Sequence, residues 1–420
     1  MKKLAIVCIG LLFATSLCFA VGGADQSGND SKQVTIEFMQ WWEPENPGLF
    51  DSIIERFQKA NPDIKINLIS KPFSDIQQQV TIAAASGTLS DVVAMDPRWA
   101  YDVAKQQAVV PMDDYFKNDS KLNGKYDMTR VNGKGYVIVF QNFIYPLFYN
   151  KTYLVDAGIA NPPSTWSELV TVAKRVTNSN KDRYALAWGL NVQSPNNIQN
   201  DLLSYIWAMD GSVYPKFDTP ANQEAFEFLI GLYKAGYIQP GALVAAEQDK
   251  VELFASGRVA MCVTSLAHIN MINQRAPNLN YDLAMMPVKD GYNGKRNFKN
   301  AVWGLGISTK SKHKEQAWKF IQFLLQPDIA TEVADVAHAF PGHKDSTVNW
   351  VNSNDLFKKA FNMYQQCGTK NESGGAPRAS RLCGIIDEQL QAHLSGKQTI
   401  RQFMQNAQKQ IDEIYAEAAK

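Results

Sequence analysis

The sequence predicts an α/β fold organised in two lobes, and three observations support this prediction. Residues 34–96 alternate short apolar segments with amphipathic ones in the order strand, helix, strand, helix, strand, which is typical of a parallel sheet covered by helices. About 400 residues follow the apolar N-terminal segment, more than one hydrophobic core usually organises. Hydrophobic residues make up 45% of the chain, which is enough to fill two large cores.

Three strands and two helices are expected at the start of the fold. The strands are predicted at residues 34–38, 64–69 and 91–96, where β-branched and other apolar residues concentrate. Apolar residues at helical spacing predict one helix over residues 49–57, ended by Asn61-Pro62, and another around residues 76–83, stopped by Gly87. These five elements are expected to belong to the first lobe.

Polar and aromatic residues follow two of these strands. Gln40-Trp41-Trp42-Glu43 comes directly after the first strand, and Asp96-Pro97-Arg98-Trp99 ends the third. In open α/β sheets, ligands bind beyond the carboxyl ends of the strands. The two segments are therefore expected to share one edge of the sheet and to line a ligand site.

Residues 133–177 are the most informative stretch of the chain. They contain a predicted strand at 136–140 and an apolar run at 143–149 that only Pro146 interrupts. Thr165 can cap the helix that begins near Trp166, and Glu168 can complete a capping box. The buried face of that helix is predicted to consist of Leu169, Val172, Ala173 and Val176.

The rest of the chain continues the alternation of strands and helices. Further strands are predicted at residues 184–190, 281–287 and 301–308, and helices at 199–209, 221–235 and 315–325. A helix is expected to turn at Gly257 into a strand that runs to Ser265.

The N-terminus has the pattern of a secretory signal peptide. Met1-Lys2-Lys3 precedes an uncharged apolar run that ends in the small residue Ala20, so residues 1–20 are predicted to be removed on export to the periplasm. A retained membrane anchor is the alternative, and Cys18 offers a second one as a lipoprotein acceptor, although Leu17 departs from the small residue usual before such a cysteine. Residues 21–33 are predicted to be a flexible tether.

Charge and histidine placement exclude several kinds of site. The 42 basic and 41 acidic residues leave a net charge of +1, without the electrostatic footprint that nucleic acid or an anionic membrane surface requires. The five histidines are scattered and no CxxC motif occurs, so no metal site and no cofactor are expected.

Three cysteines lie beyond the predicted signal peptide. Export to an oxidising compartment makes a disulfide between Cys367 and Cys383 plausible, with Cys262 free in an apolar strand. Such a bridge would stabilise the fold by about 3 kcal/mol in the chain-entropy model. Two unpaired thiols are the alternative.

Several collinear motifs resemble one protein family. The matching segments are Phe148-Tyr149-Asn150-Lys151, Ala157-Gly158, Pro162-Pro163, Thr165-Trp166-Ser167-Glu168, residues 253–261, Ala317-Trp318-Lys319-Phe320 and residues 394–414. In this order they resemble the extracellular solute-binding proteins that deliver sugars to ABC importers. The resemblance spans residues 34–415.

The resemblance implies a periplasmic-binding-protein fold whose two lobes are joined by crossing hinge segments. Lobe 1 is expected to comprise residues 34–141 and 288–327, and lobe 2 residues 142–287 and 328–420, each lobe containing a mainly parallel sheet flanked by helices. A monomeric, non-enzymatic receptor of this kind binds a mono- or oligosaccharide in the cleft, closes by hinge motion and delivers it to membrane permease subunits.

A sugar site needs flat aromatic rings for stacking and planar polar groups for paired hydrogen bonds. Residues of both kinds at strand ends and crossings are predicted to contact the ligand: Trp42, Glu43, Asp96, Trp99, Phe143, Tyr145, Asn200, Trp207, Ser265, Trp303 and Arg381. Family members often carry a Gly-Trp pair where this chain has Ser265-Leu266, so a stacking residue expected there is missing.

Structural roles compete with several of these predictions. Trp41 and Trp42 point in opposite directions if both lie in a strand, so one of them belongs to the core. Asp96 can cap the helix after it, Trp207 lies on an apolar helix face, and Arg381 can be an ordinary surface charge.

Two other functions compete with a sugar receptor. A secreted glycoside hydrolase needs two carboxylates across the scissile bond, and Glu43 and Asp96 are the candidate pair. A receptor of the same fold for a polyamine, iron or phosphate needs several acids, a tyrosine cluster or helix N-termini, respectively. No GxxxxGK[ST], GxSxG or HExxH motif occurs, which disfavours nucleotide hydrolysis, serine hydrolysis and zinc proteolysis.

Overall fold

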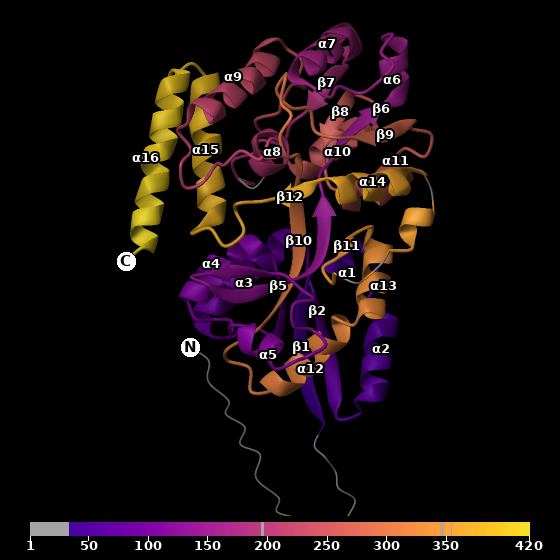
Figure 1. Ribbon diagram of the computed structural model, residues 1–420, viewed down its shortest axis with the longest axis vertical. Helices are drawn as coiled ribbons and strands as arrows, with labels where there is room; N and C mark the ends of the chain where they lie inside the picture. The colour runs from indigo at the N-terminus through magenta and orange to yellow at the C-terminus, as the bar shows by residue number, and fades with distance from the viewer. Residues whose placement is uncertain (1–32, 195–196, 345, 347, 354) are drawn as a thin grey trace, which may run out of the picture.

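The computed structural model describes residues 33–194, 197–344, 346, 348–353 and 355–420. Two lobes lie one above the other in Figure 1, each built around its own sheet, which confirms the predicted two-lobe α/β fold. The predicted signal peptide, Cys18 and nearly all of the predicted tether lie outside the described residues. Within the described ranges, no helix is long and apolar enough to cross a membrane.

The larger sheet contains the predicted strand–helix–strand–helix–strand unit. Its strands β1, β2 and β3 are paired in parallel, with β1 in the middle. The helices cover this sheet because their apolar stripes, such as Ile53 and Phe57, face it and are fully buried. The elements are β1 (Val34–Gln40), α1 (Trp42–Glu45), α2 (Asp51–Ala60), β2 (Ile64–Ser70), α3 (Phe73–Ser86), β3 (Val92–Met95), α4 (Ala100–Lys105), α5 (Asp113–Lys117) and β4 (Met128–Val131).

Two long antiparallel strands, β5 (Lys134–Ile144) and β10 (Asn297–Ile307), connect the lobes (Figure 1). The larger sheet has the order β11-β5-β10-β3-β1-β2, with β4 beside β5 and β12 (Gly368–Lys370) beside β10. After β5, the chain passes through Tyr145-Pro146 into β6 (Leu147–Asn150) of the smaller sheet. The predicted crossing near residues 141–145 coincides with this passage.

The smaller sheet has the order β7-β8-β6-β9. Only β7 and β8 are paired in parallel, and β6 runs antiparallel to both of its neighbours. The predicted mainly parallel sheets are therefore wrong in detail, because β6 in the smaller sheet and β10 in the larger sheet run against the strands that they join. The elements are α6 (Lys151–Asp156), α7 (Trp166–Val176), β7 (Tyr184–Ala187), α8 (Ser204–Ala208), α9 (Pro220–Lys234), α10 (Glu247–Ala255), β8 (Val259–Val263), α11 (Ile269–Arg275) and β9 (Tyr281–Ala284).

The C-terminal third of the chain packs against both lobes. The Gln141 side chain donates to the Ala330 carbonyl, and β11 pairs with β5, so residues 328–341 belong with the larger sheet and not with lobe 2 as predicted. Helices α15 and α16 pack on each other, and α16 packs on α9 of the smaller-sheet lobe. The elements are α12 (Lys314–Leu324), α13 (Pro327–Ala337), β11 (Phe340–Pro341), α14 (Asp355–Gln366), α15 (Ala379–Leu394) and α16 (Ile400–Ala418).

The start of α7 confirms the predicted capping box. Thr165 Oγ1 accepts from the Glu168 backbone N–H, while the Glu168 carboxylate accepts from the Thr165 backbone N–H at 3.2 Å. The Ser164 backbone and hydroxyl also donate to this carboxylate, and these hydrogen bonds lower the pKa of Glu168. The apolar face of α7 is buried as predicted.

Replacing Thr165 by alanine is expected to destabilise the protein by about 1 kcal/mol, because one N–H group of the first helical turn loses its acceptor. Urea unfolding followed by circular dichroism measures the change. Thr171→Ala, at an exposed position in the middle of the same helix, is the matched control and should change stability by less than about 0.5 kcal/mol. Equal effects of the two substitutions would contradict the capping role.

The predicted disulfide between Cys367 and Cys383 is wrong, because all three described cysteines are free thiols. Cys367 Sγ lies 3.5 Å from the Met285 sulfur, whereas Cys383 Sγ lies 3.6 Å from the Tyr214 hydroxyl. The reason is topological: Cys367 ends α14 beside β9, and Cys383 lies inside α15 against the core of the smaller-sheet lobe.

Candidate functional site

The carboxyl ends of β1 and β3 lie at one edge of the larger sheet, as predicted. Trp41, after β1, contacts Trp99, after β3, with ring centroids 5.6 Å apart. The Phe73 ring, at the start of α3, contacts Trp41 and stacks on Trp99. The three rings form an aromatic cluster, and the Trp99 indole N–H within it is buried without a hydrogen-bond partner among the described residues.

Asp96 and Arg98 form a nearly buried ion pair beside this cluster. Arg98 Nε lies 2.7 Å from Asp96 Oδ1 and its terminal nitrogen 2.5 Å from Oδ2, and the Arg98 backbone N–H also donates to Oδ1. Burial disfavours the guanidinium charge, but the Asp96 carboxylate outweighs it and raises the pKa of Arg98. Both oxygens of Asp96 are therefore occupied by Arg98.

The other lobe meets this edge through the turn before α15. The Gly375 backbone N–H donates to the Pro97 carbonyl at 3.0 Å. A Cβ at Gly374 would lie 3.3 Å from Pro97 Cβ, so glycine permits the close approach of the two segments. Ser373, in the same turn, is fully buried, and its hydroxyl has no hydrogen-bond partner among the described residues.

Lys299 and Tyr145 lie where the two connecting segments pass between the lobes. The Lys299 ammonium is centred over the Tyr145 ring at 3.6 Å, and the Tyr145 N–H donates to the Lys299 carbonyl. Only 5% of Lys299 is exposed. Burial, followed by the nearby Arg98 guanidinium, lowers the pKa of Lys299 to about 7.

A cavity of about 520 Å³ opens between the lobes beside the aromatic cluster. Both lobes contribute to its wall: Trp99 and α3 and α4 residues from one side, and the start of α15 from the other. Burial raises the pKa of Asp102 on one wall, and the Arg378 guanidinium on the other wall opposes this. The lining residues are Gln77, Val80, Thr81, Trp99, Asp102, Val103, Gln106, Arg378, Ser380 and Arg381.

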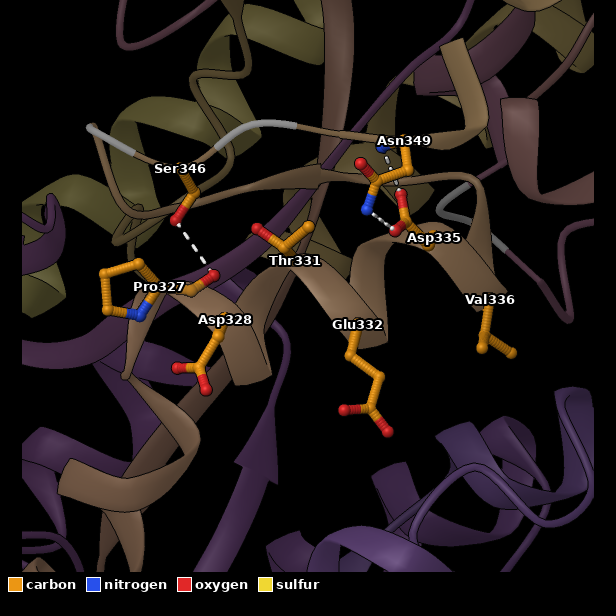
Figure 2. Close-up of a pocket in the computed structure, with 8 residues that line it drawn as sticks. All are labelled: Pro327, Asp328, Thr331, Glu332, Asp335, Val336, Ser346 and Asn349. Carbon is orange, nitrogen blue, oxygen red and sulfur yellow. Dashed lines mark hydrogen bonds between the residues drawn. The ribbon is translucent and has the colours of Figure 1, made fainter. Parts of the chain in front are cut away.

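A second cavity of about 550 Å³ lies on the outer flank of the larger-sheet lobe, along α13 (Figure 2). Two of its three acidic groups already have partners: Asp335 accepts from Asn349 and from the Trp350 N–H, and Glu332 is paired with Arg56. No aromatic ring and no predicted site residue lines it. The interlobe cavity is therefore the candidate ligand site.

A buried charged network lies beneath the cleft in the smaller-sheet lobe. Lys250 Nζ is 2.6 Å from Asp201 Oδ1 and 2.9 Å from Glu247 Oε2, and both Lys250 and Asp201 are fully buried. Burial raises the pKa of Asp201 to about 7, against the opposing charge of Lys250. For Glu247 the attraction of Lys250 prevails over burial, and the pKa of Glu247 is lowered.

Polar neighbours extend this network. Thr264 donates to Glu247 at 2.8 Å and lies 2.6 Å from His268 Nδ1, while the Asn200 amide donates to Glu247 at 2.8 Å. Residues Gln199–Leu203 form a π-helical turn, a feature that often occurs at functional sites. Both polar atoms of the Gln199 side chain are buried without a hydrogen-bond partner among the described residues.

Three predicted ligand residues pack in the core instead of facing the cleft. Trp42 is fully buried, with its ring stacked at 5.0 Å on Trp303 and at 5.5 Å on Phe140. The Phe143 ring also packs on Trp303, with the two ring centroids 4.9 Å apart. Of the adjacent tryptophans it is Trp41, and not Trp42 as predicted, that joins the aromatic cluster at the sheet edge.

Other predicted residues have structural contacts of their own. The Glu43 carboxylate accepts from the Gly48 and Phe50 N–H groups and so stabilises the turn before α2. Trp207 is fully buried and donates from its indole to Glu372 at 2.9 Å, and Ser265 caps the Ala267 N–H. Asn200 contacts Glu247, as described above.

Four predicted residues converge on the interlobe region: Asp96, Trp99, Tyr145 and Arg381. Arg381 lines the cavity and is also paired with Glu388 at 2.6 Å. Sequence reasoning missed Lys299 because the predicted strand began at residue 301, whereas β10 begins at Asn297. Arg98 could have been found, since it lies in the segment predicted to line the site.

Comparisons with known proteins agree with this architecture. The model of the bacterial extracellular solute-binding protein family matches residues 41–331. A binding protein of Brucella abortus strain 2308 is 28% identical and covers 79% of this chain and 81% of its own length. The sn-glycerol-3-phosphate-binding periplasmic protein UgpB of Escherichia coli K12 is 24% identical over 94% of this chain and 95% of its own length.

A solved structure shares the fold. The ABC transporter solute-binding protein of Thermotoga lettingae, bound with α-D-tagatose, superimposes with a TM-score of 0.77 at 20% identity and covers 90% of this chain and 99% of its own. The two chains therefore share a fold over nearly their whole length. Because the family model matches more than half of the sequence, this chain belongs to the bacterial extracellular solute-binding protein family.

Proposed function

We propose that this protein is an exported receptor that binds a mono- or oligosaccharide between its lobes and delivers it to the membrane permease of an ABC importer. The observation that carries the proposal is the composition of the interlobe cavity. It combines the Trp99 ring with planar polar groups from both lobes, Gln77 and Asp102 on one side and Arg378 and Arg381 on the other. A sugar presents both an apolar face and a ring of hydroxyls to such a wall.

Binding is coupled to hinge closure, because the two walls of the cavity belong to different lobes. Polar contacts that join the lobes beside the cavity include Gln77 Nε2 to Ser380 Oγ and the Tyr101 hydroxyl to the Ala418 carbonyl, each at 3.4 Å. Contacts this long are weak, so a ligand that bonds to both walls favours the closed form. The Tyr145-Pro146 passage and the start of β10 are the hinge segments.

The protein acts as a receptor and not as an enzyme. Glycoside hydrolysis needs two carboxylates free to act on the scissile bond, but Glu43 is engaged by backbone N–H groups and Asp96 by Arg98. The relative that holds α-D-tagatose supports the sugar class. The basic and apolar N-terminal segment supports export to the periplasm, and attachment to the membrane through Cys18 is the alternative. The receptor works as a monomer.

Calorimetry and tryptophan fluorescence test the proposal with D-glucose, D-galactose, D-tagatose, maltose and maltotriose, and with sn-glycerol 3-phosphate and putrescine as non-sugar solutes. At least one sugar should bind saturably. Trp99→Ala should weaken that binding about 30-fold, because a stacking ring is lost at the cavity wall. Trp318→Ala, which truncates a ring packed on Tyr115 and Phe116 outside the cavity, is the control.

Two results would contradict the proposed function. Saturable binding of a non-sugar solute alone would assign the protein to another solute class. Release of reducing sugar from an oligosaccharide, abolished by Glu43→Gln, would identify a hydrolase.

A further inference from the structure

Lys299 is a buried cation between the lobes whose close neighbour is an aromatic ring and not an acid. It occupies β10 opposite Lys370 of β12, and its ammonium faces the Tyr145 ring at 3.6 Å. Among the described residues, no carboxylate lies within ion-pair distance of it. A cation–π contact offsets only part of the cost of removing an ammonium from water.

The carboxylates nearest to Lys299 are already engaged by other cations. Both oxygens of Asp96 bind Arg98. Glu247 is bound by Lys250, Asn200 and Thr264. None of these acids can turn to Lys299 without leaving another buried cation or donor unpaired, which would cost more than it gains.

Two buried polar groups with weak partners lie in the same region. The Gln199 amide and the Ser373 hydroxyl make no hydrogen bond of ordinary length among the described residues, and both interact weakly with the Cys383 thiol. The Arg98 charge acts on both this thiol and Lys299. A thiol is a weak hydrogen-bonding group, so the Gln199 amide and the Ser373 hydroxyl can still bind a ligand.

We infer that the ligand carries an anionic group, a carboxylate or a phosphate, which pairs with the Lys299 ammonium while Gln199 and Ser373 bind its other oxygens. This inference rests on the proposed sugar-receptor function and narrows the ligand to an acidic or phosphorylated sugar. The cleft must open to admit it, as hinge motion allows. The anionic group of the ligand supplies the negative charge that no described carboxylate of the protein provides to Lys299.

Matched ligand pairs test the inference. We expect D-glucuronate or D-galacturonate, or glucose 6-phosphate, to bind about ten- to a hundredfold more tightly than the corresponding neutral sugar in calorimetry, the gain of one charge-assisted hydrogen bond in a buried site. The acid arm and the phosphate arm distinguish the two anions. Equal or tighter binding of the neutral sugar overturns the inference and leaves the sugar-receptor function intact.

Lys299→Met separates the charge from the side-chain volume. In this variant the anionic and the neutral sugar should bind with about equal affinity, and the affinity for the neutral sugar should change less than about threefold. Lys299→Gln repeats the test with a polar side chain, should the first variant fold poorly. Lys65→Met, at an exposed position of β2, is the matched control and should change neither affinity. A preference that survives in both Lys299 variants overturns the inference.

The pH dependence of uronate binding provides a second readout. The charged and titratable groups near Lys299 are Arg98 and Asp96 after β3, Glu247 and Lys250 of α10, Tyr145 on the crossing and Lys370 on the paired strand β12. Because the pKa of free Lys299 is about 7, the affinity should fall roughly tenfold per pH unit above this value, as the ammonium loses its proton before binding. A neutral sugar should show no such slope, and neither should Lys299→Met with uronate.

The outcomes for this inference and for the proposed function differ. If only sn-glycerol 3-phosphate binds, and Lys299→Met abolishes this binding, the inferred anionic ligand is supported and the sugar-receptor function is contradicted. If only neutral sugars bind, the sugar-receptor function is supported and the inferred anionic ligand is contradicted. No binding of any member of the panel overturns both.

Discussion

Replacing Trp42 by alanine is expected to destabilise the protein by about 3 to 5 kcal/mol. The indole is fully buried and stacked between Trp303 and Phe140, and it also contacts Phe38 and Phe50 at the top of the larger sheet. Truncation therefore removes a large apolar surface and leaves a cavity that rigid aromatic neighbours cannot fill. Urea unfolding followed by circular dichroism measures the change in the free energy of unfolding.

Trp42→Phe is the matched variant for this position. It keeps an aromatic ring in the stack and removes the indole N–H, which has no hydrogen-bond partner in the part of the chain that the structure describes, so its cost should stay below about 1.5 kcal/mol. Ligand affinity should be unchanged in Trp42→Phe. A Trp42→Ala protein that keeps its stability and loses only ligand binding would show that Trp42 contacts the ligand, as the sequence predicted.

Replacing Lys250 by methionine is expected to destabilise the protein by about 3 to 5 kcal/mol, because two buried carboxylates lose their shared cation. Asp201 is fully buried, and its other partner is the Gly189 N–H at 2.8 Å. Lys289→Met is the control: it breaks an exposed pair with Glu224 and should cost less than about 1 kcal/mol.

The stability lost in Lys250→Met is expected to depend on pH. Burial raises the pKa of Asp201 to about 7, above its ordinary value, so the folded state holds this proton more tightly than the unfolded state. The stability contributed by protonated Asp201 is present at low pH and is lost as the pH rises through about 7. The Lys250→Met deficit should therefore be largest at about pH 8 and shrink towards about pH 5. A deficit independent of pH would mean that packing, and not charge, explains it.

Much of the fold could be predicted from local pattern. The alternation of apolar segments placed β1, α2, β2, α3 and β3 within a few residues of their observed bounds, because strand and helix periods are written into each short segment. The capping box at Thr165 was equally local. The disulfide was not, since whether Cys367 meets Cys383 depends on where α14 and α15 pack.

The site was predicted only in part, and particular residues show why. The sequence placed Asp96 and Trp99 at the correct sheet edge, because the end of a strand fixes its side of a parallel sheet. It chose Trp42 over Trp41, because the choice depends on how the chain leaves β1 and on which rings lie above it. Lys299 was missed because nothing local shows that a strand lysine will be enclosed by the other lobe.

The sequence by itself determined that the chain has α/β structure and an aromatic sheet edge, since these follow from periodicity and from the ends of strands, and its family resemblance implied two lobes joined by crossing segments. Only the tertiary structure decided which side chains face the cleft and which charges lack partners. The reason is that burial and pairing arise between segments as distant as Asp96, Gln199, Lys299 and Ser373, and no local pattern records such contacts.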